Sequence, residues 1–440
     1  MADRSPVARL MLGASALTTL GAIPPFLLGA QAVLIMRDLG FGAARLGIAV
    51  STFFAVAAVA TILASGLLER WGAGRMLLAA GVLVASGGLG LALLVQDWWA
   101  LVVAMAVLGA GNATCQGASN RTVATLLPAS RRGLGFGLKQ SAVPVAIMLG
   151  GLAVPTTTTL FGWRSTFGVA GAVGVLVALA GVVVLGRERT ARGAPPGTAQ
   201  PRAAETGGTR SAGSSAVGPR DLPPPGPLLL CGVATTFASA AANFLGSYLA
   251  SWAHEVGLTI SQAGLLMAAG SGASVLSRVL LGFQADRRYG GNLAVVASLT
   301  LVGAVCLAAL GAVPREWAVV LFGFLAFALG WSWPGLYLYA VARLGRDTPT
   351  RASSVVQAGA FVGGALGPVG FGTVVESLGF QGAWLAGAGS FTVAGILTLL
   401  ARRGFRRDLF TRPPAEPFGF GGGRRSPRFT TQPPSFDTRS

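Results

Sequence analysis

The sequence predicts an all-α membrane protein in which twelve transmembrane helices form two parallel six-helix repeats. Of its 440 residues, 52% are hydrophobic and only 11% are charged, whereas about a quarter of the residues in a soluble domain are charged. The mean hydropathy is +0.65. A soluble fold could not bury so many apolar side chains and cover its surface with so few charges. These values exclude an ordinary cytosolic enzyme, a disordered chain and a disulfide-rich secreted domain.

Twelve stretches contain no Asp, Glu, Lys or Arg and have the length of about 20 residues that a spanning helix needs. None shows the alternation of membrane barrel strands, so we expect helices. The stretches cover residues 10–36, 46–68, 76–96, 98–120, 140–163, 165–186, 222–253, 256–277, 289–314, 317–342, 352–375 and 377–401.

The distribution of arginine predicts the orientation. Twelve spans place both termini on the same side, and the segments on that side carry 26 arginines against 4 in the opposite loops. The positive-inside rule therefore predicts two cytoplasmic termini and a multi-pass protein of the plasma membrane. The net charge of +18 follows from this bias and suits contact with the lipid bilayer. We expect no nucleic-acid partner, because the basic residues are spread over many loops.

The chain divides into two halves. Residues 187–227 are rich in Pro, Gly, Ala and Ser, which predicts a flexible cytoplasmic linker between six-helix bundles at 1–186 and 228–401. Residues 402–440 predict a disordered cytoplasmic tail. The halves also repeat, since a shift of 217 positions superposes Gly29 on Gly246, Gln140 on Gln357 and Gly162 on Gly379. Each half holds an even number of helices, so the two copies have the same orientation.

Two loops at equivalent positions of the repeat carry the same acid–arginine pair, Glu69-Arg70 after the second span and Asp286-Arg287 after the eighth. These loops resemble the G-x-L-a-D-R-x-G signature of the major facilitator superfamily, as do the twelve spans and the six-plus-six repeat. The resemblance implies alternating access by rocker-switch motion, with these loops acting as gates. Glu69 departs from the usual Asp, and the second loop has one extra residue. A plain polar turn is the alternative.

A narrower resemblance concerns the substrate. The Gly-rich run 132–140 and Trp331-Ser332-Trp333-Pro334-Gly335 resemble the cyanate-permease-like branch of the superfamily, which implies an anionic substrate. Gly367-Pro368 in span eleven resembles a glycine–proline motif that antiporters carry in span five, but span five here lacks it. Span four also has Met105 where drug–proton antiporters keep a buried arginine. Both departures count against a multidrug antiporter.

Three cations fall in or near the spans, namely Arg121, Lys139 and Arg278, and none has a charged counterpart in the repeat. Intramembrane ionisable residues are functional candidates. We expect Lys139 and Arg121 to hold an anionic substrate and Arg278 to act in gating. The alternatives are snorkelling to the headgroups and, for Arg278, an ion pair with Asp286.

Polar and aromatic stripes supply further candidates. Asn112, Gln116 and Asn120 share one face of span four, and the family resemblance implies that spans one, four, seven and ten line the cavity. Interhelical hydrogen bonds and core packing are the alternatives. The candidates for substrate binding are Lys139, Arg121, Gln140, Asn112, Gln116, Asn120, Gln31, Asn243, Tyr248, Trp333, Tyr337 and Gln357. The candidates for hinges are Pro24, Pro25, Gly150, Gly367 and Pro368.

Together these features predict a secondary transporter that moves a small solute, and we expect this solute to be an anion. The alternatives are an exporter of hydrophobic or drug-like compounds and a membrane-embedded enzyme. The enzyme needs a nucleophile–base pair at membrane depth, for which the spans offer no suitable acid. We expect no cofactor and no metal, because one histidine and three scattered cysteines provide no ligand cluster. We expect a monomer.

Overall fold

The computed structural model confirms the all-helical membrane fold. It describes residues 5–126, 140–193, 221–287 and 290–413, without the side chains of 5–10, 64–70, 120–126, 188–189, 191–193 and 286. In this part of the chain, every regular element is helical and eleven helices are long and apolar enough to cross a membrane.

The N-terminal half comprises α1 (Ser5–Ala30), α2 (Ala32–Leu39), α3 (Ala43–Arg70), α4 (Ala73–Leu93), α5 (Trp98–Leu126), α7 (Ala142–Ala153), the π-helical turn η2 (Val154–Thr158), α8 (Thr159–Phe161) and α9 (Trp163–Gly193). The C-terminal half comprises α10 (Pro225–Val256), α11 (Ile260–Arg287), α12 (Asn292–Ala312), α13 (Glu316–Leu325), the π-helical turn η3 (Ala326–Gly330), α14 (Trp333–Leu344) and α15 (Pro349–Thr411).

The last element contains two of the predicted spans. α15 runs for 63 residues but bends at Gly379, where the backbone leaves the helical region at φ 72° and ψ 175°. A straight helix of that length would extend about 95 Å, three times the thickness of a bilayer core. The bend therefore separates spans eleven and twelve. The charge-free stretches predicted this boundary at Glu376, but Glu376 is helical and the boundary lies three residues later. The Glu376 carboxylate accepts a hydrogen bond from the Ala44 amide at 2.9 Å.

The bend at Gly379 has a counterpart in the other half. Gly162, 217 positions earlier, adopts φ 77° and ψ 164° at the turn between α8 and α9. A positive φ of this kind strains residues that carry a Cβ atom. The shared backbone geometry gives the sequence repeat a structural equivalent.

Several spans are interrupted within the bilayer region. The first breaks at Gln31 between α1 and α2, although α1 continues through Pro24 and Pro25. The fifth contains η2 with Pro155, and the tenth changes from η3 to α14 at Trp331 and Ser332. Proline accounts for part of this irregularity, since it has no N–H for the helical ladder.

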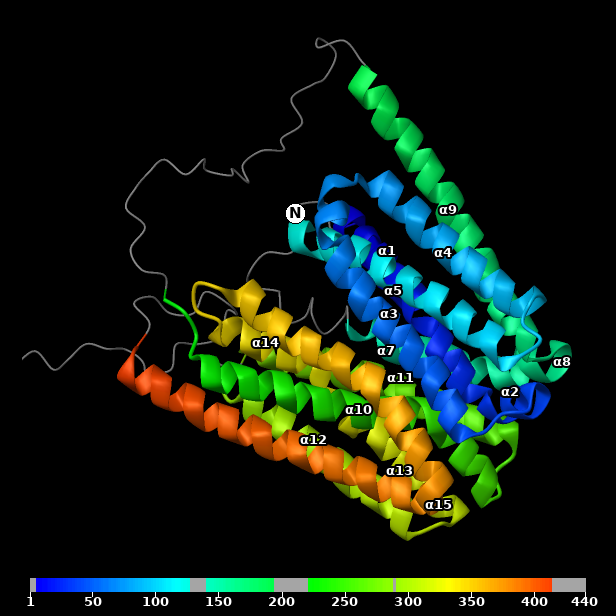
Figure 1. The fold of residues 1–440 in the computed structure, drawn as a ribbon. Coiled ribbons are helices and arrows are strands. Elements are labelled where there is room, and N and C mark those ends of the chain that lie inside the picture. Colours follow the sequence, from blue (N-terminus) through cyan, green and yellow to red (C-terminus); the bar gives the residue numbers. More distant parts are fainter. Residues whose placement is uncertain (1–4, 127–139, 194–220, 288–289, 414–440) are drawn as a thin grey trace, which may run out of the picture.

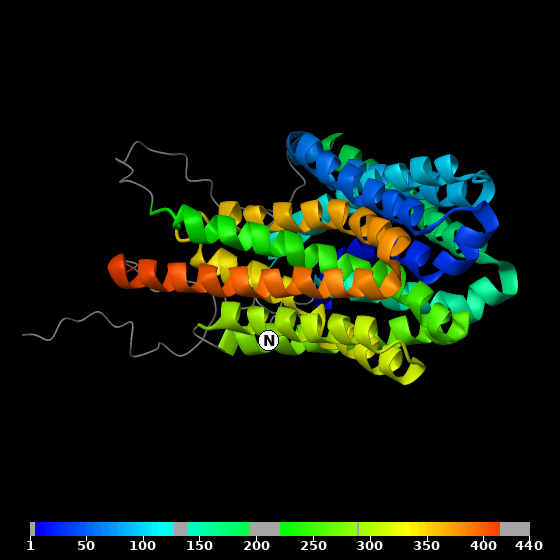
Figure 2. The same ribbon diagram turned by 60° about the horizontal axis from the view of Figure 1, so that its bottom comes forward.

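The two halves meet mainly at one end of the molecule. We call this the Gly379 end, and we call the opposite end, where α14 turns into α15, the Arg346 end. Within the halves, α4 packs on α9 and α10 packs on α15, while α3–α15 and α7–α11 contacts join the halves. The ribbons converge at the Gly379 end and splay toward the Arg346 end (Figure 1). Figure 2 shows the last turns of α15 extending past the neighbouring helices at the Arg346 end.

Candidate functional site

A cavity of about 190 Å³ lies between the halves. Helices α1, α3, α5 and α7 line it from one half, and α10, α11, α14 and α15 line it from the other. Beyond the cavity toward the Gly379 end, α1 and α10 are in close contact, because a Cβ atom on Gly29 would collide with the Gly246 carbonyl. The two halves are therefore tightly packed on that side of the cavity.

Much of the wall is aromatic. The Trp331 ring lies between Phe26 of α1 at 5.8 Å, edge to face, and Phe327 at 5.7 Å, stacked. Phe53 and Phe54 contact each other edge to face at 5.2 Å on α3. Such pairs prefer edge-to-face or offset geometry and present a rigid apolar surface. The aromatic residues of the wall are Phe26, Phe53, Phe54, Trp331, Trp333 and Phe361.

The polar part of the wall consists mainly of neutral side chains. Asn243 donates its amide to the Ser239 carbonyl at 2.8 Å, one turn earlier on α10. The Asn112 and Asn243 Oδ1 atoms and the Trp333 Nε1 atom are buried and have no hydrogen-bond partner among the described residues. Unused polar atoms in a buried wall are unusual. The neutral polar residues of the wall are Thr61, Asn112, Gln116, Gln140, Thr235, Ser239, Asn243 and Gln357.

One cation, Arg278 of α11, belongs to the described wall. Its side chain is buried, with 2% of the residue exposed. One terminal nitrogen donates to the Gln140 carbonyl of the opposite half, and the other donates to the Trp331 carbonyl at 2.5 Å. Only Nε is without a partner. These two contacts use two of the five N–H donors of the guanidinium and hold it between the two halves.

Three predicted binding residues lie away from the cavity. Gln31 is fully buried among α1, α8 and α9, where it donates to Thr166 at 2.9 Å and accepts from Thr158 at 3.1 Å. The Tyr248 hydroxyl bonds the Ala43 and Pro368 carbonyls. In this structure each satisfies its polar group through interhelical hydrogen bonds and neither lines the cavity, so their role in substrate binding stays a prediction.

Tyr337 is the third of these residues. Its hydroxyl lies 3.1 Å from the Thr398 hydroxyl of α15, and 1% of the residue is exposed. Its i, i+4 neighbour Trp333 does line the cavity. The stripe in span ten therefore splits, with Trp333 at the wall and Tyr337 packed within the C-terminal half.

Several predicted residues cannot be placed. Lys139 lies outside the described residues, and so do the side chains of Arg121, Asn120, Glu69, Arg70 and Asp286. Arg287 is exposed, and its guanidinium lies 3.9 Å from the centre of the Phe283 ring on its own helix. Their substrate-binding and gating roles stay predictions.

The hinge candidates occupy tight helix crossings. A Cβ atom on Gly367 would lie 2.7 Å from Ala240 Cα, and one on Gly150 would lie 3.2 Å from the Phe26 carbonyl. Pro24, Pro25 and Pro368 are buried. These positions are crossing points of the bundle, and their role as hinges stays a prediction.

Sequence reasoning missed Phe53, Phe54, Thr61 and Phe361, because the family resemblance implied that spans one, four, seven and ten line the cavity, and these four residues lie in spans two and eleven. Gln357 and Phe361 are spaced i, i+4 and share one face of α15, a signal that could have identified Phe361. The phenylalanines of α3 lie in an unbroken apolar run, where nothing separates a cavity position from a packing position.

Comparison with known proteins decides the family. The sequence profile of the Major Facilitator Superfamily matches residues 7–231 and 228–431. The chain belongs to this superfamily. It is 31% identical over 398 residues to a chloramphenicol resistance protein of Streptomyces lividans, covering 87% of this chain and 92% of that protein. The superfamily consists of transporters, so the chain is a multi-pass membrane transporter and not an enzyme.

Solved structures agree with this fold. A bacterial homologue of the human lysosomal transporter Spinster, inward-facing and occupied, superposes with a TM-score of 0.66 at 16% identity, covering 92% of this chain and 99% of that one. The unoccupied inward-facing form gives 0.64 at the same identity and coverage. The assignment to the cyanate-permease-like branch finds no support in these comparisons.

Proposed function

We propose that this transporter exports uncharged, drug-like amphiphiles of the chloramphenicol type. The observation that carries the proposal is the described cavity wall, which combines many aromatic rings and neutral amide and hydroxyl groups with one described cation, and that cation donates to two backbone carbonyls. Binding sites for small molecules are predominantly apolar with a few oriented polar groups. Chloramphenicol has an aromatic ring, two hydroxyls and an amide, which match this wall.

The unpartnered polar atoms support a neutral ligand with both donors and acceptors. The Oδ1 atoms of Asn112 and Asn243 can accept from a hydroxyl or amide N–H, and Trp333 Nε1 can donate to a carbonyl. A ligand that satisfies them offsets the cost of leaving them buried and unpaired. The resistance function of the Streptomyces lividans relative points to the same class of compound.

The proposed direction of transport, export, rests on the orientation of the protein in the membrane. The arginine bias supports a cytoplasmic location for the Arg346 end and for both termini of a plasma-membrane protein. The halves splay toward that end (Figure 1). In the proposed export cycle, the cavity takes its substrate from the cytoplasmic side and releases it after the halves rock, by the alternating access of parallel-repeat transporters. We propose that a monomer performs this cycle.

A small anion is the second candidate substrate. Gln140 lines the cavity and follows Lys139 directly in the chain, and a lysine attracts an anion as a compact point charge. Arg121 is the second cation of this hypothesis. The two candidates therefore differ in whether Lys139 contributes to ligand binding.

A thermal-shift experiment separates them. Purified wild type and Lys139→Gln are heated with chloramphenicol, formate, cyanate or nitrate. A ligand at 100 times its Kd stabilises the folded protein by about 2.7 kcal/mol. We expect chloramphenicol to stabilise both proteins equally and the anions to stabilise neither. Stabilisation of wild type alone by an anion, with no effect of chloramphenicol, would overturn the proposal in favour of the second candidate.

A further inference from the structure

The repeat relates two of the helix seams that join the halves, α3–α15 and α7–α11. In the α3–α15 seam, Gly47 packs against the Pro368 carbonyl; in the α7–α11 seam, a Cβ atom on Gly264 would lie 2.7 Å from the Gly151 carbonyl. Gly47 and Gly264 are 217 positions apart, as are Gly151 and Pro368. Near the Gly379 end, the two seams are therefore equivalent close-packed crossings.

Toward the Arg346 end, the equivalence is lost. Arg278 of α11 donates across its seam to the Gln140 carbonyl of the N-terminal half. The repeat places Thr61 and Gln357 at the corresponding positions of the α3–α15 seam. Thr61 donates instead to the Ala57 carbonyl of its own helix at 2.7 Å, and no hydrogen bond between described residues joins Thr61 or Gln357 across that seam.

Arg278 also donates a hydrogen bond to a backbone carbonyl at a helix break in its own half. The helical path of span ten is interrupted at Trp331 and Ser332, so the Trp331 carbonyl is free to accept a hydrogen bond from Arg278. Ser332 reinforces the break, because its hydroxyl donates to the Ala328 carbonyl at 2.7 Å. A guanidinium is suited to this position, since its rigid fork carries several donors at once.

The geometry points to Arg278 as a positioning residue that keeps the α7–α11 seam together and fixes the break at Trp331, so that the halves part along the α3–α15 seam. The inference concerns the motion and depends on the superfamily's alternating access, not on the substrate. It goes beyond the proposed function by assigning unequal roles to two seams that the repeat relates.

Two physical arguments support this assignment. Separation of α7 from α11 would take the guanidinium away from the Gln140 carbonyl of the opposite half, and a carbonyl left without its donor where little water is present costs free energy. The cavity wall is also biased toward the other seam. Phe53, Phe54 and Thr61 of α3 face Gln357 and Phe361 of α15 across it, whereas the α7–α11 seam contributes only Gln140, Val143 and Arg278 to the described wall.

Distances between spin labels in lipid nanodiscs test the inference. One pair, Leu63 and Ser354, spans the α3–α15 seam, and the other, Val145 and Leu276, spans the α7–α11 seam. Leu63, Ser354 and Leu276 are exposed and accept a label readily. Protein without introduced cysteines controls for labelling of the three buried native ones. We expect two distance populations for the first pair and a single narrow one for the second.

Arg278→Gln should add a second population to the α7–α11 pair, and Thr61→Val, the matched change at the repeat-equivalent position, should not. Any one of three results would overturn the inference. These are two distance populations across α7–α11 in wild type, a single distance population across α3–α15 in wild type, and an unchanged α7–α11 distance in Arg278→Gln. If Arg278→Gln does not fold, Thr61→Arg decides, because a guanidinium at that position should remove the second α3–α15 population. Failure there also overturns the inference. Since no substrate is added, these results are independent of the proposed function.

Discussion

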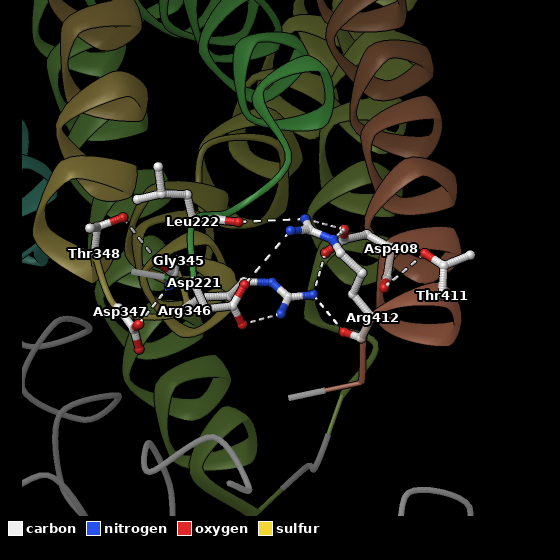
Figure 3. Close-up of polar contacts among 9 residues, drawn as sticks. All are labelled: Asp221, Leu222, Gly345, Arg346, Asp347, Thr348, Asp408, Thr411 and Arg412. Carbon is white, nitrogen blue, oxygen red and sulfur yellow. Dashed lines mark hydrogen bonds and ion pairs between the residues drawn. The ribbon is translucent and has the colours of Figure 1, made fainter. Parts of the chain in front are cut away.

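The two ends of the molecule use their polar contacts differently. At the Gly379 end, the contacts join the halves, with Glu376 accepting from the Ala44 amide at 2.9 Å, Tyr248 donating to the Ala43 carbonyl at 3.0 Å and the Val369 amide donating to Ser51 at 3.1 Å. At the Arg346 end, an ion-pair cluster of Asp221, Arg346, Asp408 and Arg412 lies wholly within the C-terminal half (Figure 3).

That cluster ties together three segments of one half. Arg346 lies in the turn between α14 and α15 with 3% of its side chain exposed, and it pairs with Asp221 ahead of α10 and with Asp408 at 2.6 Å near the end of α15. Burial alone would lower the pKa of Arg346. The hydrogen bonds that Arg346 makes to Asp408 and Asp221, together with the negative charges of these two residues, outweigh burial and raise the pKa above its ordinary value. The hydrogen bonds of Glu376, Tyr248 and Val369 thus hold the halves together at one end, whereas the ion-pair cluster stiffens a single half at the other, as rigid-body rocking requires.

The largest expected effect comes from breaking the close crossing near the Gly379 end. Gly47→Leu would push a side chain into the Pro368 carbonyl and the Tyr248 hydroxyl. We expect a loss of about 3 kcal/mol in the free energy of unfolding, the upper range for overpacking a core, measured by SDS titration. Gly90→Leu is the matched control, because no atom lies within 4 Å of its Cβ position. Equal stability of the two variants would contradict the crossing's role.

The ion-pair cluster should give the next largest effect. Arg346→Gln removes the buried cation and leaves Asp408, which has 10% of its side chain exposed, with only the partly exposed Arg412. We expect a loss of about 2 kcal/mol, reduced from the full cost of an unpaired buried charge by solvent around Asp221. Arg351→Gln, an exposed arginine in the first turn of α15, controls for loss of charge. Because the cluster lies within one half, label distances across the two seams should stay unchanged.

Removing a single interhelical donor should have a smaller effect. Tyr248→Phe deletes the hydroxyl that donates to the Ala43 and Pro368 carbonyls. We expect a loss of about 1 kcal/mol, the net value of a typical hydrogen bond, together with a shift of the seam distances toward an open Gly379 end. An unchanged distance distribution would show that this hydroxyl does not hold the halves together.

The smallest effect is expected at the exposed ion pair between α2 and α9. The pKa of the Asp38 carboxyl lies below its usual range, mainly because Arg164 donates a hydrogen bond to it at 2.5 Å. Burial acts in the opposite direction, and a hydrogen bond from Trp163 lowers the pKa further. A lowered pKa stabilises the fold above the unfolded pKa, and this stability is lost as the pH falls through the folded value. Asp38→Asn should cost about 0.5 kcal/mol at pH 7, as exposed pairs do, and should flatten the stability profile below pH 4. A steeper profile in the variant would contradict this assignment.

Much of the fold could be predicted because its signals are additive over many residues. Charge-free stretches predicted the spans, and the 217-residue offset predicted the equivalence of Gly162 and Gly379, which share a backbone geometry. The boundary at Glu376 failed because a helix tolerates a carboxylate that has a partner on another helix. Charge thus predicts membrane spans better than it predicts the residues at which helices end.

The candidate site was less predictable because polar side chains do not reveal what they face. Asn112 and Gln31 are both buried amides in apolar helices, yet Asn112 lines the cavity and Gln31 bonds two threonines. The partners of Arg278 are backbone carbonyls, which carry no residue-type signal in the sequence. Sequence therefore supplied a set of candidate residues, and packing selected among them.

The most direct test of the account is the flux of radiolabelled chloramphenicol in proteoliposomes. The account predicts saturable flux by wild type that excess formate does not inhibit, equal flux in Lys139→Gln, and loss of saturable flux in Asn243→Leu, which replaces a polar wall residue with an apolar one of similar size. Saturable formate flux that depends on Lys139, with no chloramphenicol flux in any protein, would contradict the account.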